Sequence, residues 1–237
     1  MLVNDYHGRE GNRVWVSAEQ GSRFAKEVAG DFNPIHDAEN RRFCVPGDLL
    51  FALVLSHYGL AERMTFRFLG RVGADAVIEL PADDGAELVV TDADDRRCLA
   101  VEREGETIHD PAVIEPFIRS YVAFSGQSFP HILQPLLARH GVMFNPDRPL
   151  VMYESMAFEL DRLAIDAPEA ELDESVLNVA PKRADALLHF AIRTPAGRVG
   201  KGSKRFMISG LRDYDERRMQ EVIREYEARR AAFHESA

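Results

Sequence analysis

The sequence predicts an α+β fold of two similar units in tandem, each an antiparallel sheet curved around a central helix. Three observations lead to this prediction. Residues 47–60 are apolar on nearly every side, so a helix there must be enclosed by other elements. Runs of alternating apolar and polar residues follow from residue 64, which is typical of half-buried strands. The order of helix, turn and strands in the first half is then repeated, in degraded form, after residue 115.

The two units are expected at residues 1–112 and 113–210, with a C-terminal helix at 211–237 that packs on the outside of the sheet or against a partner chain. A chain of 237 residues is long enough for two such units. Residues 1–13 are polar and are expected to be irregular, and residues 14–16 are expected to form a short strand. Ser17 and Gln20 match a capping box, which predicts a helix from Ser17 to a stop at Gly30.

A second loop signal follows at once. Asn33 is a favoured N-cap, and Pro34 suits the first position of a helix because its missing N–H is not needed there. This places His36 in the first turn of a short helix and Asp31 on the loop before it. Both side chains can then converge on one small volume, where a carboxylate and an imidazole can activate water.

The remaining elements are predicted by alternation and by the repeat. In the second copy, Gly126 and Pro130 align with Gly30 and Pro34, whereas Gln127 replaces Asp31 and Ile132 replaces His36. The second copy therefore keeps the turn and loses the proton-transfer pair, as in a pseudo-dimer with one site. Strands are expected at 64–69, 76–80, 87–91, 99–104, 150–160, 176–179, 186–194 and 199–209, and helices at 115–124 and 133–140.

Composition excludes several classes of function. The net charge of −10 argues against nucleic-acid binding, which needs clustered Lys and Arg. No window approaches the length of a membrane span, and the N-terminus has no signal-peptide pattern. The two cysteines have no metal-ligand spacing, so we expect neither a metal site nor a disulfide. A cytoplasmic location is the expectation that follows.

The string Gly-Asp-Phe-Asn-Pro-Ile-His at residues 30–36 resembles the signature of the MaoC-like, (R)-specific enoyl-CoA hydratase branch of the hotdog superfamily. The resemblance implies a double hotdog fold and an enzyme that adds water to a trans-2-enoyl-CoA or acyl-carrier thioester, without a cofactor. It further implies that Asp31 and His36 are the catalytic dyad, that Asn33 holds their loop, and that the Gly47 N–H polarises the thioester carbonyl. Over its full length, the chain resembles a proteobacterial family that carries this motif and has no established activity.

Three departures from the hydratase pattern leave alternatives open. Asp48 stands where an apolar residue is usual, Asp37-Ala38 follows the motif where an acid is expected one position later, and residues 37–46 form a shorter segment than is typical. We expect Asp48 to be a first-turn acid that faces solvent, because an inward carboxylate would oppose negative charge on the substrate. An acyl-CoA thioesterase and a non-catalytic acyl-thioester binding or regulatory protein are the alternatives.

The contacts to a substrate are less well defined by the sequence. The anionic phosphates of CoA need a local basic patch, and the candidates are Arg41-Arg42, Lys182-Arg183 and residues 201–205, each of which is more typical of a solvated face. Tyr121 and Ser125 are candidates to line a site across the interface between the units. Acyl chain length and carrier stay open, and so does a homodimer formed through the sheet edges.

Overall fold

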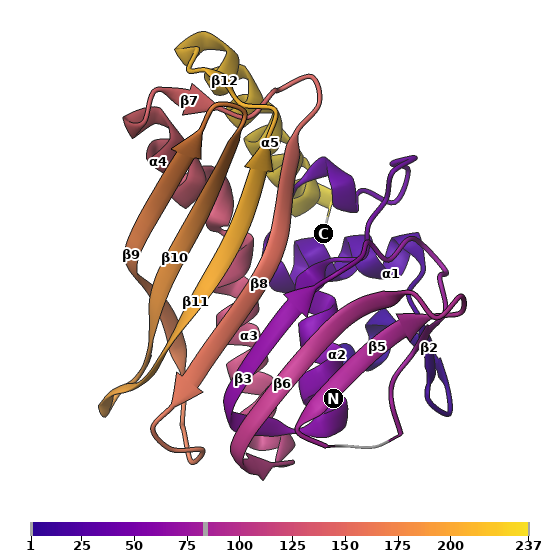
Figure 1. Cartoon of the computed structure of the whole chain (residues 1–237). Helices are drawn as coiled ribbons and strands as arrows, with labels where there is room; N and C mark the ends of the chain where they lie inside the picture. The colour runs from indigo at the N-terminus through magenta and orange to yellow at the C-terminus, as the bar shows by residue number, and fades with distance from the viewer. Residues whose placement is uncertain (1, 83–84, 237) are drawn as a thin grey trace.

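A computed structural model describes residues 2–82 and 85–236 of the chain (Figure 1). Within these residues one antiparallel sheet runs in the order β1-β2-β4-β5-β6-β3-β8-β11-β10-β9. Its strands are β1 (Gly8–Glu10), β2 (Arg13–Trp15), β3 (Leu60–Phe68), β4 (Ile78–Glu79), β5 (Glu87–Asp92), β6 (Arg97–Ile108), β8 (Leu150–Leu160), β9 (Glu169–Ala180), β10 (Arg183–Thr194) and β11 (Gly197–Ser209). A separate pair is formed by β7 (Val142–Met143) and β12 (Arg212–Asp213).

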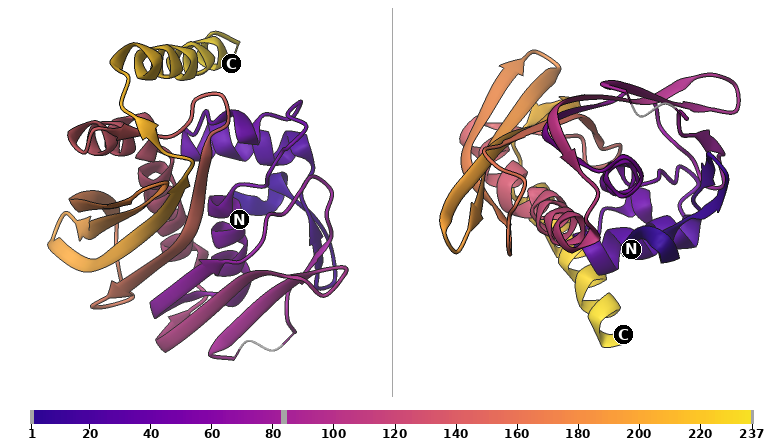
Figure 2. Two further views of the ribbon diagram at one scale, coloured as in Figure 1. Left: turned by 45° about the horizontal axis from the view of Figure 1, so that its top comes forward. Right: turned by 90° about the horizontal axis from the view of Figure 1, so that it is seen from below.

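The two halves of the chain share this sheet through β3 and β8. The register of that pairing runs from Arg63 opposite Glu159 to Arg67 opposite Ser155. Seen from below in Figure 2, the sheet curves around α2 (Gly47–Tyr58) on the side of the first half. The predicted α+β class is therefore confirmed, with the continuous curved sheet and enclosed helix of a tandem hotdog fold.

The helices begin and end largely where the local signals place them. Ser17 and Gln20 exchange both hydrogen bonds of a capping box at the start of α1 (Ala18–Arg23), which continues as the π-helix η2 (Phe24–Ala29) and stops at Gly30. The first residues are not irregular, because they form the 3₁₀ helix η1 (Leu2–Tyr6) and the strand β1. The other helices are η3 (Pro34–His36), α3 (Pro111–Gly126), η4 (Ser128–Ile132), α4 (Leu133–Arg139) and α5 (Glu216–Ser236).

The main core surrounds α2, as its apolar sequence requires. Every residue of α2 from Asp48 to Leu55 is buried, and α3 packs along it. A second core lies under the other half of the sheet, where α4 packs against Phe206 and Ile208 of β11. Both cores lie on the side of the sheet that the helices cover.

The C-terminal helix α5 lies on this helical side, and its predicted place outside the sheet is wrong. Met219 is fully buried in the second core, and Val222 and Ile223 pack against it. Figure 2 shows α5 at one end of the molecule, beside α4, and its Tyr226 is hydrogen-bonded to the loop that follows η2. None of the helices in residues 2–82 and 85–236 is long and apolar enough to cross a membrane.

Candidate functional site

The loop that carries Asp31 and His36 is held by its own backbone chemistry. Gly30 ends the helix in the left-handed conformation with φ 64°, which glycine adopts without strain. The side chain of Asn33 then accepts a hydrogen bond from the Ile35 N–H at 3.2 Å, and Pro34 is the first residue of η3. The predicted N-cap and proline start are both confirmed. The conformation of the loop is thus set by Gly30, Asn33 and Pro34 themselves.

Each member of the Asp31–His36 pair is oriented by a second hydrogen bond. Asp31 Oδ1 accepts from the Asn33 N–H at 2.8 Å, which leaves Oδ2 facing His36. His36 Nδ1 lies 2.7 Å from the carbonyl oxygen of Cys44, and because a carbonyl only accepts, Nδ1 carries a proton. His36 Nε2 then faces Asp31 Oδ2 at 3.7 Å.

This separation is too long for a direct hydrogen bond, but one water molecule can bond both atoms at about 2.8 Å. The side chains of Asp31 and His36 are 25% and 14% exposed, so solvent can reach them. The structure therefore brings together the two residues that the sequence pairs.

The first residue of α2, Gly47, lies beside aromatic side chains from both halves of the chain. A Cβ atom at Gly47 would lie 3.1 Å from the rings of Phe68 and Tyr153, so glycine allows the rings to approach the backbone. Backbone N–H groups in the first turn of a helix have no intrahelical partner and favour negative charge. Gly47 is thus placed on the part of the helix where a carbonyl oxygen could be polarised.

Asp48 does not face solvent, and that expectation is wrong. Its side chain points into the interface between the two units, and the residue is only 7% exposed. The hydroxyl of Ser125 in α3 donates to Asp48 Oδ2 at 2.6 Å, while Lys204 Nζ in β11 donates to the same Ser125 Oγ. Asp48, Ser125 and Lys204 therefore form one buried chain of polar groups, the Asp48–Lys204 network.

The network is balanced in charge, but one of its atoms lacks a partner. Among the described residues, Asp48 Oδ1 is buried without a hydrogen bond. Burial raises the pKa of the Asp48 carboxyl, and this is opposed by the positive charge of Lys204 and the hydrogen bond from Ser125. Burial also lowers the pKa of Lys204, which the negative charges of Asp48 and Asp31 oppose. The negative charge of Asp31 also raises the pKa of Asp48, so the dyad and the network are electrostatic neighbours.

Aromatic rings surround the network. Lys204 Nζ lies 4.2 Å from the ring centre of Tyr153 and 4.6 Å from that of Phe206, which are cation–π contacts. The hydroxyl groups of Tyr121 and Tyr153 are hydrogen-bonded to each other, and burial raises the pKa of both well above the ordinary value. Tyr121 and Ser125 thus lie at the interface between the units.

The sequence reading missed Lys204 and the inward direction of Asp48, although signals for both were present. Lys204, Phe206 and Ile208 stand at alternate positions of β11, so their side chains lie on the same face of the strand. Because Phe206 and Ile208 are apolar, this alternation predicts that Lys204 also faces inward. Asp48 belongs to a helix with no polar face, which leaves no solvent side for it. Residues 201–205 are therefore not one basic patch, since Lys204 points inward and Lys201 pairs with Glu159 at 3.3 Å on the outer face.

The C-terminal helix contacts the loop directly. The Tyr226 hydroxyl donates to the Gly30 carbonyl at 3.3 Å and accepts from the Phe32 N–H at 3.2 Å. The Phe32 ring also contacts the rings of Tyr226 and Phe233 edge to face. Asp37, one of the departures noted above, lies 3.0 Å from Lys26 Nζ and 3.8 Å from Arg229 Nε. It therefore anchors the loop to η2 and α5.

Tyr226→Phe is expected to lower the free energy of unfolding by about 1–3 kcal/mol at pH 7, because it leaves a buried N–H and a carbonyl unpaired. Burial and the charge of Asp31 raise the pKa of Tyr226 to about 12. A raised pKa means that the stabilisation is complete below pH 10 and is lost as pH rises toward 12. Urea unfolding of both proteins from pH 8 to 12 checks this, and a difference that stays constant or grows would contradict it.

The degenerate second loop packs against the first. A Cβ atom at Gly126 would lie 1.9 Å from the carbonyl oxygen of Ala29, so only glycine fits at this crossing. Ala29 precedes Gly30, which is the residue that Gly126 matches in the repeat. Gln127 and His131 are both exposed, and neither joins the network. The two copies of the turn thus meet, and the acid and imidazole come from the first.

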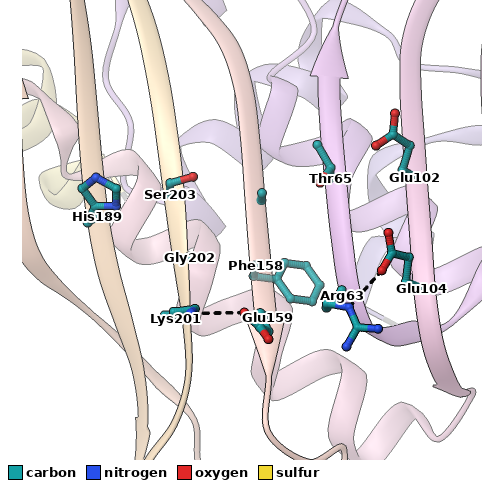
Figure 3. Close-up of a pocket in the computed structure, with 11 residues that line it drawn as sticks. Arg63, Thr65, Glu102, Glu104, Phe158, Glu159, His189, Lys201, Gly202 and Ser203 are labelled. Atoms are coloured by element: carbon teal, nitrogen blue, oxygen red, sulfur yellow. Dashed lines mark hydrogen bonds and ion pairs between the residues drawn. The ribbon is translucent and has the colours of Figure 1, made fainter.

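A separate groove of about 310 Å³ crosses the outer face of the sheet where β3 and β8 join (Figure 3). Its walls carry cross-strand ion pairs, such as Arg63 with Glu104 at 3.0 Å. Neither Asp31, His36 nor any member of the Asp48–Lys204 network lines this groove. It is therefore distinct from the site at the end of α2.

The chain is similar to a solved protein with a hot dog fold from Alicyclobacillus acidocaldarius, at 11% identity, a TM-score of 0.46, and coverage of 88% of this chain and 98% of that one. It is also similar to the tesB protein of Mycobacterium avium subspecies paratuberculosis, at 10% identity and a TM-score of 0.47, with coverage of 87% of this chain and 97% of that one. A third similar structure is an acyl-CoA thioesterase II from Mycobacterium marinum, at 11% identity and a TM-score of 0.45, with coverage of 91% of this chain and 99% of that one.

No curated protein matches the chain. A family model, described as "Protein of unknown function (DUF3581)", matches residues 1–217. This match spans both units, from η1 to the start of α5. The chain therefore belongs to the DUF3581 family.

Proposed function

We propose that this protein activates water against an acyl thioester at Asp31, His36 and the N-terminus of α2. The observation that carries the proposal is the geometry of the dyad. Two groups able to accept a proton face each other at 3.7 Å, and each is fixed by a separate backbone contact. General acid–base catalysis needs this kind of positioned pair.

The leading reaction is hydration of a trans-2-enoyl thioester. Asp31 and His36 hold one water molecule and take one of its protons as the oxygen forms a bond to C3. The electrons of the C2–C3 double bond then move to the thioester carbonyl, which accepts hydrogen bonds from the first turn of α2, including the Gly47 N–H. Return of the proton from the dyad to C2 completes a 3-hydroxyacyl thioester, so that all atoms of the water end in the product.

Hydrolysis of the thioester is the second candidate. The same water would attack C1, and the C1–S bond would break to release a carboxylate and a thiol. The hydrogen bond of His36 to the Cys44 carbonyl, three residues before Gly47, holds the dyad near the end of α2. This arrangement favours hydrolysis, because C1 is the carbon that bears the polarised oxygen. The protein from Mycobacterium marinum is named as a thioesterase.

One assay separates the two reactions. Purified protein is mixed with saturated and trans-2-enoyl-CoA thioesters of increasing length, while enoyl absorbance and free thiol are recorded together. Hydration removes the enoyl absorbance without releasing free thiol, whereas hydrolysis releases free thiol from both the saturated and the enoyl thioester. His36→Ala is expected to abolish either signal, since it removes one of the two groups that hold the water. Glu39→Ala, an exposed change on the same loop, is the matched control.

If neither signal arises at any length, water activation is excluded for these thioesters. Binding of the same thioesters, measured by a rise in melting temperature, would then support the third possibility, a non-catalytic binding or regulatory protein. Absence of binding as well would overturn the proposal as a whole.

A further inference from the structure

We propose that the site takes a short acyl group that carries a neutral hydrogen-bond donor, such as a hydroxyl, and that this donor bonds Asp48 Oδ1. The inference rests on the proposed function, because it assumes that the thioester carbonyl lies at the first turn of α2. It goes further by assigning the class of acyl group.

The first support is the unpartnered oxygen. Asp48 is 7% exposed, and among the described residues its Oδ1 has no hydrogen-bond partner, whereas its Oδ2 is bonded by Ser125. A buried carboxylate oxygen without a donor is costly, so such an atom calls for an explanation. A donor on a bound ligand would supply the missing bond.

The second support is position. Asp48 directly follows Gly47 at the start of α2, and His36 is hydrogen-bonded to the carbonyl of Cys44, three residues before Gly47. An acyl group that enters past the dyad and places its carbonyl at the helix end therefore has Asp48 on its inner side. A plain hydrocarbon there would cover the carboxylate without donating a hydrogen bond to Asp48 Oδ1. A hydroxyl group would donate that hydrogen bond.

The third support limits length. The space behind Asp48 is filled by aromatic side chains that are almost fully buried, with ring centres 4.7 Å apart for Phe51 and Tyr121 and 5.6 Å apart for Tyr121 and Phe190. Cores of this kind are close-packed and leave no tunnel for a long chain. The acyl group therefore ends near Asp48 and is short, and the four-carbon thioesters are the probes chosen below.

The fourth support excludes a charged acyl group. Asp48 and Lys204 carry opposite charges and are joined through Ser125, so the network is neutral as a whole. Lys204 has its donors directed to Ser125 and to the rings of Tyr153 and Phe206. A carboxylate on the acyl group would meet the Asp48 carboxylate first, and like charges repel.

The test compares 2-butenoyl-CoA with 4-hydroxy-2-butenoyl-CoA, which differ in one hydroxyl. Wild-type protein is expected to favour the hydroxylated thioester by about 10–100-fold in kcat/KM, the range for a hydrogen bond to a charged group. Asp48→Asn removes the charge and should reduce this preference at least fivefold. Asp48→Leu with Lys204→Met should reverse it. The same pair of thioesters is also compared by thermal shift in Asp31→Asn, which reports binding without turnover.

The outcomes separate this inference from the proposed function. Equal or better use of 2-butenoyl-CoA by wild type would overturn the inference and leave the proposed function standing. A larger thermal shift with the hydroxylated thioester in Asp31→Asn, lost when Asp48→Asn is added, would support the inference even if wild type turned neither over. A hydroxyl preference that survives Asp48→Leu with Lys204→Met would also overturn it.

Discussion

Asp31→Asn is expected to lower turnover of any active thioester by about 100- to 10,000-fold, the usual contribution of a positioned general acid–base group. Asparagine has nearly the same shape, and its carbonyl oxygen can still accept the hydrogen bond from the Asn33 N–H that Asp31 Oδ1 accepts. The asparagine side chain, however, cannot take a proton from water. The change therefore removes chemistry while leaving the loop in place.

The measurement is kcat and KM for the substrate found in the assay above, together with urea unfolding. We expect kcat to fall, KM to change little, and the free energy of unfolding to stay within about 0.5 kcal/mol of wild type, because Asp31 is partly exposed. Glu39→Gln is the matched control, since Glu39 is an exposed acid on the same loop. Loss of activity in Glu39→Gln as large as in Asp31→Asn would contradict a specific role for the dyad.

The fold was largely predictable because local signals and the global arrangement agree. The strand expected at residues 150–160 has those bounds as β8, and the capping box at Ser17 and Gln20 forms as written. Asn33 and Pro34 predict the start of η3 from their own backbone preferences. Each of these features depends on residues close together in the chain, so one sequence contains the information.

The Asp31–His36 pair was predictable for the same reason. The two residues are five positions apart, and a single turn brings them together. The orientation of the pair was not predictable, because it depends on the Cys44 carbonyl, which bonds His36 across the loop. The contact of Tyr226 with Gly30 and Phe32 spans almost the whole chain and has no local signal.

The Asp48–Lys204 network lies beyond what the pattern of one element can predict. Its members come from α2, α3 and β11, and Ser125 is 77 positions from Asp48 and 79 from Lys204. Alternation indicates that Lys204 faces inward, but not that it meets a carboxylate there. A rule that charged residues face solvent fails at these two residues because each is the other's counter-charge.

Lys204→Met is expected to lower the free energy of unfolding by about 3–5 kcal/mol at pH 7, since it leaves the buried Asp48 carboxylate without a counter-charge. The double change Asp48→Leu with Lys204→Met removes both charges and should regain most of that loss. Lys201→Met is the matched control. It lies three residues earlier on the same strand and pairs with Glu159 in solvent, so its effect should be below about 1 kcal/mol.

The pH dependence of the stability lost in Lys204→Met distinguishes a missing counter-charge from lost packing. In Lys204→Met the folded pKa of Asp48, already raised by burial, rises further because the ammonium that lowered it is gone. A carboxyl whose pKa is raised in the folded state stabilises the fold below its unfolded pKa and loses that contribution as pH increases. The deficit relative to wild type should therefore shrink as pH falls from 7 to 4. Urea unfolding across that range tests this, and a deficit that is constant with pH would show lost packing around Lys204 instead of an uncompensated charge.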